Sequence, residues 1–198
     1  DAPGGNVTGT SDMNPVVDQI DLLHQLAPEA KKVGLLYCTA ESNSKIQIEL
    51  AAAELKKLGI EGVEYTASSS NEVQQVVESM MGKVDAIYTP TDNTIASAMT
   101  VIASIANEHK VPTVCGEVAH VEAGGLASLS INYEELGRRA GEMAVRILTE
   151  GAEPAAMPIE SMGAAECDLV YNGRTAEALG IDVTSLVEDG ATDVSAAE

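Results

Sequence analysis

Basic side chains are scarce in this sequence. Its 198 residues hold 11 Lys and Arg against 31 Asp and Glu, which gives a formal net charge of -20 at pH 7. A chain this acidic is repelled by the phosphates of nucleic acids and by anionic lipid surfaces. The composition therefore argues against a nucleic-acid partner and against attachment to an anionic membrane surface.

Cysteine and histidine are also sparse. The three cysteines match neither a disulfide framework nor the ligand spacing of a zinc site, and the histidines lie far apart with no second histidine at helical spacing. A Walker-type phosphate loop and a G-x-S-x-G nucleophile elbow are missing as well. We therefore predict no metal and no cofactor. The three cysteines are Cys38, Cys115 and Cys167, and the three histidines are His24, His109 and His120.

Long apolar runs and large aromatic side chains are the remaining absences. No stretch approaches the roughly 20 apolar residues that span a bilayer. The chain has no Trp, no Phe and five Tyr, so it holds few aromatic walls for enclosing a ligand.

What the sequence does contain is an alternation of short buried strands and amphipathic helices. Residues 33–38 and 84–88 are apolar runs too short for a helix and bounded by turn residues, which is typical of strands buried on both faces. Helical spacing follows each strand, for example at Ile95, Ala98 and Ile102. Repeated βα units with short connections predict an α/β fold with a doubly wound parallel sheet.

Two polar turns follow these strands. One comprises Thr89 and residues 90–94 (PTDNT), and the other spans residues 39–44 (TAESNS). In an open α/β sheet, ligands bind outside the carboxyl ends of the strands, where the next helix presents free N–H groups. We therefore expect a binding site at this edge of the sheet.

The motifs together resemble one family, the extracytoplasmic solute-binding proteins of ABC transporters, in the subfamily associated with tryptophan or tyrosine uptake. The ordered set covers residues 3 to about 182. It consists of residues 3–12 (PGGNVTGTSD), 42–44 (SNS), 68–75 (SSSNEVQQ), 83–88 (KVDAIY), 90–94 (PTDNT) and 133–137 (YEELG).

The resemblance implies a type I periplasmic-binding-protein fold, in which two Rossmann-like lobes close on a ligand. The chain would then be a fragment that begins at the hinge and lacks the N-terminal lobe. Residues 1–130 would form the C-terminal ligand-binding lobe, and residues 131–153 a return helix belonging to the other lobe. Residues 154–182 would form a crossover and C-terminal segment, and the acidic, small-residue-rich residues 183–198 a disordered tail.

An amino-acid ligand has a carboxylate, an ammonium and a side chain, and each of these groups needs a different kind of partner. Its carboxylate suits the helix N-terminus at Ser42, Asn43 and Ser44, residues that could equally serve as helix caps. Its ammonium needs a fixed anion, for which Asp92 is the first candidate and Glu117 the second. Relatives commonly have Ser-Asp where this chain has Gly116 and Glu117. Hydrogen bonds could come from Thr89, Thr91 and Asn93, although Asp92 or Asn93 could instead be the N-cap of the next helix.

The resemblance also implies partners and a location. A solute-binding protein delivers its ligand to the membrane permease of an ABC transporter, outside the cytoplasm, in the periplasm or as a cell-surface lipoprotein. The helix at residues 133–149 would present an apolar face with no partner here, and such a patch favours association. We therefore expect a homodimer, or a domain-swapped packing, through this helix.

Two alternatives stay open at this stage. Cys38 and Cys115 both end strands at the expected site edge, as the paired thiols of an amino-acid racemase would, although the flanking residues lack the patterns of that enzyme class. The bilobal fold also serves ligand-sensing domains of repressors and chemoreceptors. We predict a binding protein rather than an enzyme.

Overall fold

The computed structural model describes residues 2–195. The chain divides into two compact units, each described here by itself. The larger unit combines Pro15–Ser130 with Asp168–Glu198, and the smaller combines Asp1–Asn14 with Ile131–Cys167.

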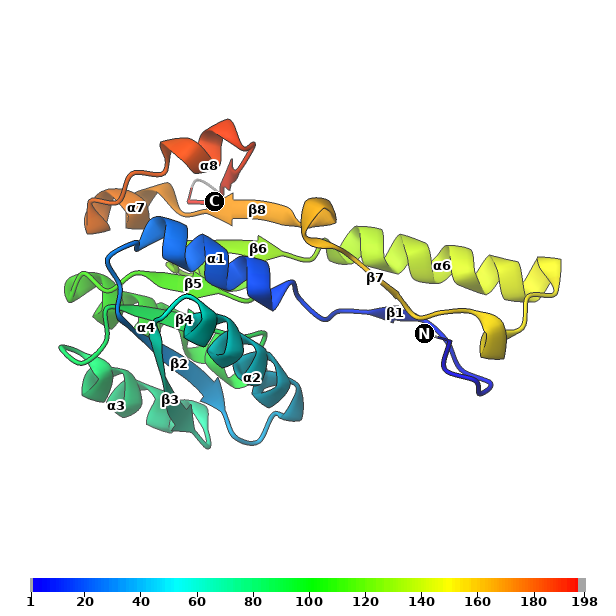
Figure 1. The fold of residues 1–198 in the computed structure, drawn as a ribbon, viewed down its shortest axis with the longest axis horizontal. Coiled ribbons are helices and arrows are strands. Elements are labelled where there is room, and N and C mark those ends of the chain that lie inside the picture. The colour runs from blue at the N-terminus through cyan, green and yellow to red at the C-terminus, as the bar shows by residue number, and fades with distance from the viewer. Residues whose placement is uncertain (1, 196–198) are drawn as a thin grey trace. The chain divides into compact units, whose positions relative to one another are not determined.

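A seven-stranded sheet forms the centre of the larger unit (Figure 1), with strand order β3-β2-β4-β5-β6-β8-β9. Neighbouring strands are parallel except for β6 and β8. The predicted doubly wound α/β sheet is confirmed, with one antiparallel pair added. The strands are β2 (Lys32–Cys38), β3 (Glu61–Ala67), β4 (Ala86–Thr89), β5 (Thr113–Cys115), β6 (Ala127–Ser130), β8 (Asp168–Tyr171) and β9 (Thr192–Asp193).

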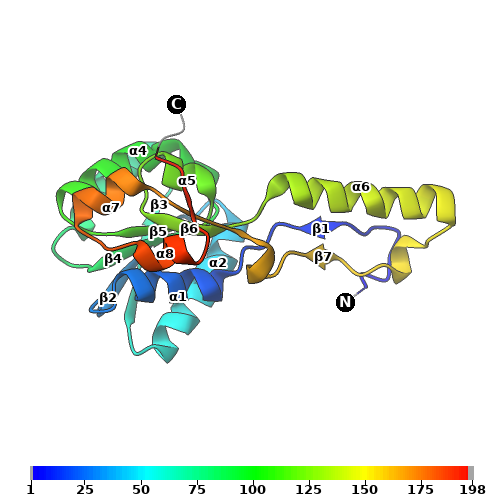
Figure 2. The ribbon, with the colours of Figure 1, turned by 90° about the horizontal axis from the view of Figure 1, so that it is seen from above.

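Helices cover both faces of this sheet (Figures 1 and 2). In Figure 2, α1 and α2 lie below the strands, and α4 and α5 lie above them. The helices of the unit are α1 (Val16–Leu26), α2 (Ser42–Lys57), α3 (Ser70–Met80), α4 (Asn93–Glu108), α5 (Val118–Glu122), α7 (Gly173–Leu179) and α8 (Thr184–Glu188).

The apolar strands divide their side chains between two cores because successive residues of a strand point to opposite faces. Leu35 of β2 packs in the core with α1 and α2, whereas Leu36 packs in the core with α3 and α4. Both are fully buried, and burying such a side chain contributes about 1.5–3 kcal/mol. The central strands are therefore held in one register from both sides.

The turns that follow β4 and β5 lie against each other. A Cβ atom added to Gly116 would lie 2.4 Å from the backbone nitrogen of Thr91. Only glycine permits so close an approach of two backbones. The carboxyl ends of β4 and β5 are thereby brought to the same place at the edge of the sheet.

The prediction of a disordered tail at residues 183–198 is wrong for the part that the structure describes. Helix α8 buries Leu186 against the core that contains α1, and β9 adds a parallel strand beside β8. The Asp193 carboxylate also accepts a hydrogen bond of 3.0 Å from the Gly173 N–H. A few apolar residues outweigh the acidic composition because they complete an existing core. Residues 196–198 lie outside the described residues.

The smaller unit consists of α6 (Tyr133–Glu150), the two-residue parallel strands β1 (Thr10–Ser11) and β7 (Glu160–Ser161), and two short 3₁₀ turns at Pro154–Ala156 and Ala164–Glu166. Leu136 of α6 is buried with Ile131 and Met162.

The two units divide the chain differently from the predicted boundaries. Residues 2–14 belong with α6 rather than with the sheet, and the segment from Asp168 onward belongs with the sheet. The pairing of β1 with β7 has no sequence signal because each strand has only two residues. The predicted assignment of α6 to a second lobe stays a prediction.

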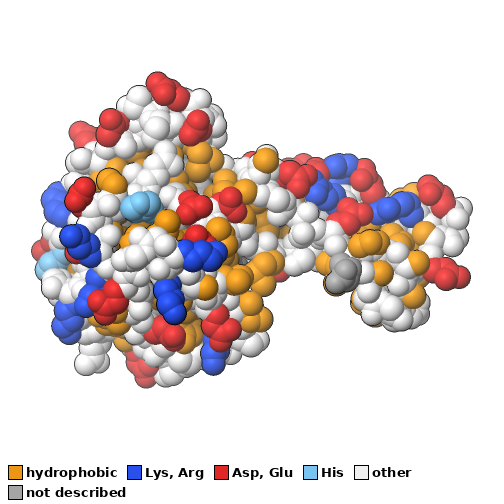
Figure 3. Space-filling model, viewed as in Figure 1, with side chains coloured by type: hydrophobic (Ala, Val, Ile, Leu, Met, Phe, Trp, Pro, Cys, Tyr) orange, Lys and Arg blue, Asp and Glu red, His pale blue; other side chains and the backbone are white. Residues whose placement is uncertain are grey.

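Helix α6 is apolar on a face that the smaller unit leaves uncovered. Leu136 and Met143 are its only buried residues, whereas Val145 is 53% and Leu148 82% exposed. Acidic and basic side chains are also visible on this part of the molecule (Figure 3). Arg138, Glu142 and Arg146 line the same hollow as Val145, and Arg146 pairs with Glu160 of β7 at 2.6 Å. The ionic contacts tie α6 to its own unit and leave the apolar residues available.

Candidate functional site

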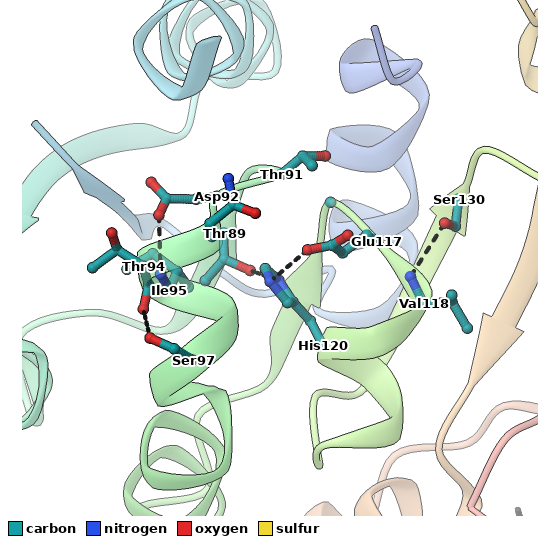
Figure 4. Close-up of polar contacts among 12 residues, drawn as sticks. Thr89, Thr91, Asp92, Thr94, Ile95, Ser97, Glu117, Val118, His120 and Ser130 are labelled. Atoms are coloured by element: carbon teal, nitrogen blue, oxygen red, sulfur yellow. Dashed lines mark hydrogen bonds and ion pairs between the residues drawn. The ribbon is translucent and has the colours of Figure 1, made fainter. Parts of the chain in front are cut away.

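Asp92 lies at the start of α4 and joins three elements through one carboxylate (Figure 4). Its Oδ1 accepts a hydrogen bond from the Ile95 N–H at 2.9 Å, which caps α4. Its Oδ2 accepts from the Cys38 N–H at 2.7 Å, at the end of β2, and from the Ser44 hydroxyl at 2.8 Å, in the first turn of α2. Asp92 is fully buried.

These contacts favour the N-cap role of Asp92 over contact with a ligand. The carboxylate already accepts three hydrogen bonds and is fully buried, so a ligand ammonium could reach it only if the surrounding turns moved apart. Ser44 is fully buried too, and its hydroxyl is directed at Asp92. The geometry gives both residues a positioning role: they hold the starts of α2 and α4 together.

Glu41, which the sequence analysis did not select, closes the N-terminus of α4. Its carboxylate accepts from the Asn93 N–H at 3.1 Å and from the Thr94 N–H at 2.9 Å. Partial burial acts to raise the pKa of the Glu41 carboxyl, but the hydrogen bonds from Thr94 and Asn93 outweigh it, and the pKa lies below its ordinary value. No local pattern could have indicated this contact, because Glu41 lies 52 positions from Asn93.

The N-terminus of α2 is different. Its N-cap residue is Glu41, which gives this helix no side-chain hydrogen bond because its carboxylate is turned to α4. Ser42 and Asn43 are exposed, and the Asn43 amide donates to the Thr91 carbonyl at 3.0 Å. The first N–H groups of a helix and its dipole attract an anion. Of the two predicted turns, this one therefore remains open to a ligand carboxylate.

Thr89, His120 and Glu117 form a second polar group at the ends of β4 and β5 (Figure 4). The Thr89 hydroxyl lies 3.2 Å from His120 Nδ1, and His120 Nε2 lies 3.0 Å from Glu117 Oε1. The latter pair is close but is not aligned as a hydrogen bond. Thr89 and His120 are fully buried, whereas the Glu117 side chain is 21% exposed. Glu117 is therefore the accessible member of the group.

The cysteines do not form a reactive pair. Cys38 and Cys115 are buried, with exposed fractions of 1% and 0%. Burial raises the pKa of the Cys115 thiol to about 12, the hydrogen bond that Thr89 would give to the thiolate acts against that rise, and the charge of Glu117 adds to it. A thiol that stays protonated cannot take the proton of a substrate. This geometry argues against a racemase.

Gln19 is a second residue that sequence reasoning missed. Its amide nitrogen donates to the carbonyls of Gly116 at 3.2 Å and Leu129 at 2.8 Å, and its Oε1 accepts from the Tyr88 hydroxyl at 2.7 Å. One buried side chain of α1 thus fixes the ends of β4, β5 and β6. A glutamine on a helix facing a sheet was its only sequence signal.

The structure brings the predicted site residues together only in part. Asn43 and Ser44 both contact Thr91, and Ser44 also contacts Asp92. Asn93 contacts Glu41 rather than another predicted residue, and Ser42 is exposed. Thr89 and Glu117 are joined through His120. Within residues 2–195, no group of three His, Cys, Asp or Glu side chains is placed to hold a metal ion.

Comparison with known proteins decides the family. The sequence profile described as "ABC transporter substrate binding protein" matches residues 1–195, almost the whole chain. The chain belongs to this family. Its members are binding proteins and not enzymes, in agreement with the buried thiols.

Among related proteins, the tyrosine-binding protein of Clostridioides difficile (strain R20291) is 41% identical over 183 residues, which are 92% of this chain and 52% of that protein. A ligand-free, open substrate-binding protein with adhesive properties from Clostridium difficile is 40% identical, with a TM-score of 0.80. An ABC domain from Streptococcus pneumonia in complex with L-Trp is also 40% identical, with a TM-score of 0.85.

These relatives are longer than this chain. The alignments cover 98% and 96% of the chain but 64% of each of the two structures. The chain thus spans about half the length of the curated relative and about two thirds of the solved ones.

More distant structures share the fold alone. A LacI family transcriptional regulator from Bifidobacterium animalis subsp. lactis is 14% identical, with a TM-score of 0.61. This likeness supports the type I periplasmic-binding-protein fold and says nothing of function. None of the helices within residues 2–195 is long and apolar enough to cross a membrane.

Proposed function

We propose that this chain supplies one side of the amino-acid site of an ABC importer, and that the ligand is aromatic, either tryptophan or tyrosine. The support comes from two relatives at about 40% identity, one described as binding tyrosine and one in complex with L-Trp. The site in this chain would comprise the start of α2 and Glu117, on turns that follow strands of the same parallel sheet.

The open N-terminus of α2 is the observation that carries the proposal. The ligand carboxylate would lie at Ser42 and Asn43, which are exposed residues of a helix start that receives no hydrogen bond from the side chain of its N-cap residue, Glu41. The ligand ammonium would lie at the partly exposed Glu117 carboxylate rather than at the fully buried Asp92. Since the chain has no Trp or Phe, the aromatic walls would come from the remaining length seen in its relatives.

A titration with three ligands tests this assignment. L-tryptophan carries both charged groups, tryptamine lacks the carboxylate, and indole-3-propionate lacks the ammonium. Each can be followed by its own fluorescence, because the chain contains no Trp. We expect saturable binding of L-tryptophan and at least about tenfold weaker binding of each analogue, since a charge-assisted contact contributes about 1.5–3 kcal/mol. Equal binding of all three would contradict it.

The partner and the location follow from the same proposal. A binding component of an ABC importer works outside the cytoplasm and releases its ligand to a membrane permease. We further propose that the chain forms a homodimer through the uncovered face of α6, where Val145 and Leu148 are exposed.

A further inference from the structure

We propose that His120 is a positioning residue, which holds the Glu117 carboxylate where it meets the ammonium of an amino-acid ligand. The inference rests on the proposed function and adds to it the residue that makes the site selective for a ligand with an α-ammonium group. His120 itself is fully buried, so it acts through Glu117 rather than by contact with the ligand.

The tautomer of His120 follows from its neighbours. A carboxylate cannot donate, and two acceptor atoms 3.0 Å apart repel each other, so the contact with Glu117 Oε1 favours a proton on Nε2 although the pair is not aligned as a hydrogen bond. In a neutral ring Nδ1 is then an acceptor, and the Thr89 hydroxyl at 3.2 Å donates to it. Thr89 thus selects the ring state that presents an N–H to Glu117.

Burial makes this arrangement specific to one carboxylate. Within residues 2–195, Nε2 has no aligned hydrogen bond, and Glu117 is the acidic side chain beside it. A buried N–H without a partner costs free energy. Side-chain conformations of Glu117 that bring its carboxylate toward the ring are therefore favoured. Such preorganisation reduces the ordering that ligand binding would otherwise require.

Glu117 keeps accepting capacity for a ligand. Its carboxylate is partly exposed, and within residues 2–195 it accepts no aligned hydrogen bond. Glu117 also lies at the N-cap of α5, but its side chain makes no cap hydrogen bond. The N–H of Val118, the first residue of α5, donates instead to the Ser130 hydroxyl at 3.2 Å (Figure 4). The Glu117 carboxylate is therefore not engaged in the common structural use of an acidic residue at this position.

Two ligands and a set of variants of this chain test the inference. His120→Leu removes the N–H, His120→Gln keeps a donor at the position of Nε2, and His109→Leu is the control for losing an exposed histidine. We expect His120→Leu to weaken L-tryptophan binding about tenfold and indole-3-propionate binding less than twofold. His120→Gln should restore most of the affinity, and His109→Leu should change neither.

A double variant separates positioning from a merely structural role. In a Glu117→Gln background, His120→Leu should weaken L-tryptophan binding no further, because its effect passes through the carboxylate. Additive losses, or equal weakening of both ligands, would overturn the inference while leaving the proposed function intact.

A spectroscopic measurement decides the case in which the unmodified chain binds neither ligand. That result would contradict the proposed function for this chain, and the ¹⁵N resonances of the His120 ring would then test the arrangement alone. We expect the Nε2–H tautomer, with ring shifts that change in Glu117→Gln. The Nδ1–H tautomer, or ¹⁵N chemical shifts of the His120 ring that are unchanged in Glu117→Gln, would overturn the inference.

Discussion

At the scale of single residues, the site edge is organised by buried polar side chains that no ligand needs to touch. Asp92 is directed inward at Ile95, Cys38 and Ser44, and Gln19 joins three strand ends from α1. Buried groups of this kind are costly to leave unpaired, so each fixes the backbone around it. The exposed residues, Asn43 and Glu117, depend on that fixed backbone for their positions.

Removing the Asp92 carboxylate should destabilise the chain. Asp92→Ala deletes the α4 cap and two further hydrogen bonds in a fully buried place, which should lower the free energy of unfolding by about 3 kcal/mol. Urea denaturation measures it, with Asp21→Ala on the exposed face of α1 as the control. An unchanged denaturation midpoint for Asp92→Ala would mean that these hydrogen bonds do not stabilise the fold, and Asp92 would again be a candidate ligand contact.

Glu41 should make stability depend on pH. Its pKa is lower in the folded chain than its ordinary value, so the ionised form stabilises the fold, and this contribution is lost as the pH falls below about 4.3. Glu41→Gln should lower the free energy of unfolding by about 1–2 kcal/mol at pH 7. The difference from the unmodified chain should shrink in acid. Glu177→Gln, at an exposed position of α7, is the control and should show no such convergence.

At the scale of elements, hydrophobic periodicity predicted most helices and strands correctly, because strands buried on both faces and helices covering a sheet leave strong patterns. The two-residue strands β1 and β7, the short helix α5, the strand β8 and the tail elements α8 and β9 were not predicted. Their formation depends on pairing and packing with distant parts of the chain. The site was predictable to a similar extent. The turns were found, whereas the contacts of Glu41 and Gln19 and the contact between His120 and Thr89 join residues 31 or more positions apart. The pair of His120 and Glu117 is only three positions apart, but it depends on the helical turn of α5.

The folded tail can be tested at two neighbouring positions of α8. Leu186 is 1% exposed and packs in the core with α1, whereas Val187 is 50% exposed. Leu186→Ala should lower the free energy of unfolding by about 2–4 kcal/mol, and Val187→Ala should change it by less than about 0.5 kcal/mol. Thermal or urea denaturation gives both values. Equal, small effects would mean that residues 184–188 contribute nothing to the core.

At the scale of the whole molecule, composition and surface act in opposite directions on association. A net charge of -20 keeps copies of the chain apart. The exposed apolar residues of α6 favour contact, since the smaller unit buries only Leu136 and Met143 of that helix. Charge repulsion is weakened by salt, whereas apolar contact is not. Association should therefore increase with ionic strength.

The molar mass of the chain in solution measures the balance between charge repulsion and apolar contact. It can be followed by light scattering at increasing protein and salt concentrations. We expect the fraction of dimer to rise with protein concentration and with salt concentration, because burial of Val145 and Leu148 removes apolar surface from water. The double variant Val145→Ser, Leu148→Ser should remain a monomer under the same conditions. Val101→Ser, at an exposed apolar position of α4, should associate like the unmodified chain. A monomer mass for the unmodified chain throughout would contradict the dimer, and the face of α6 would then need a different partner.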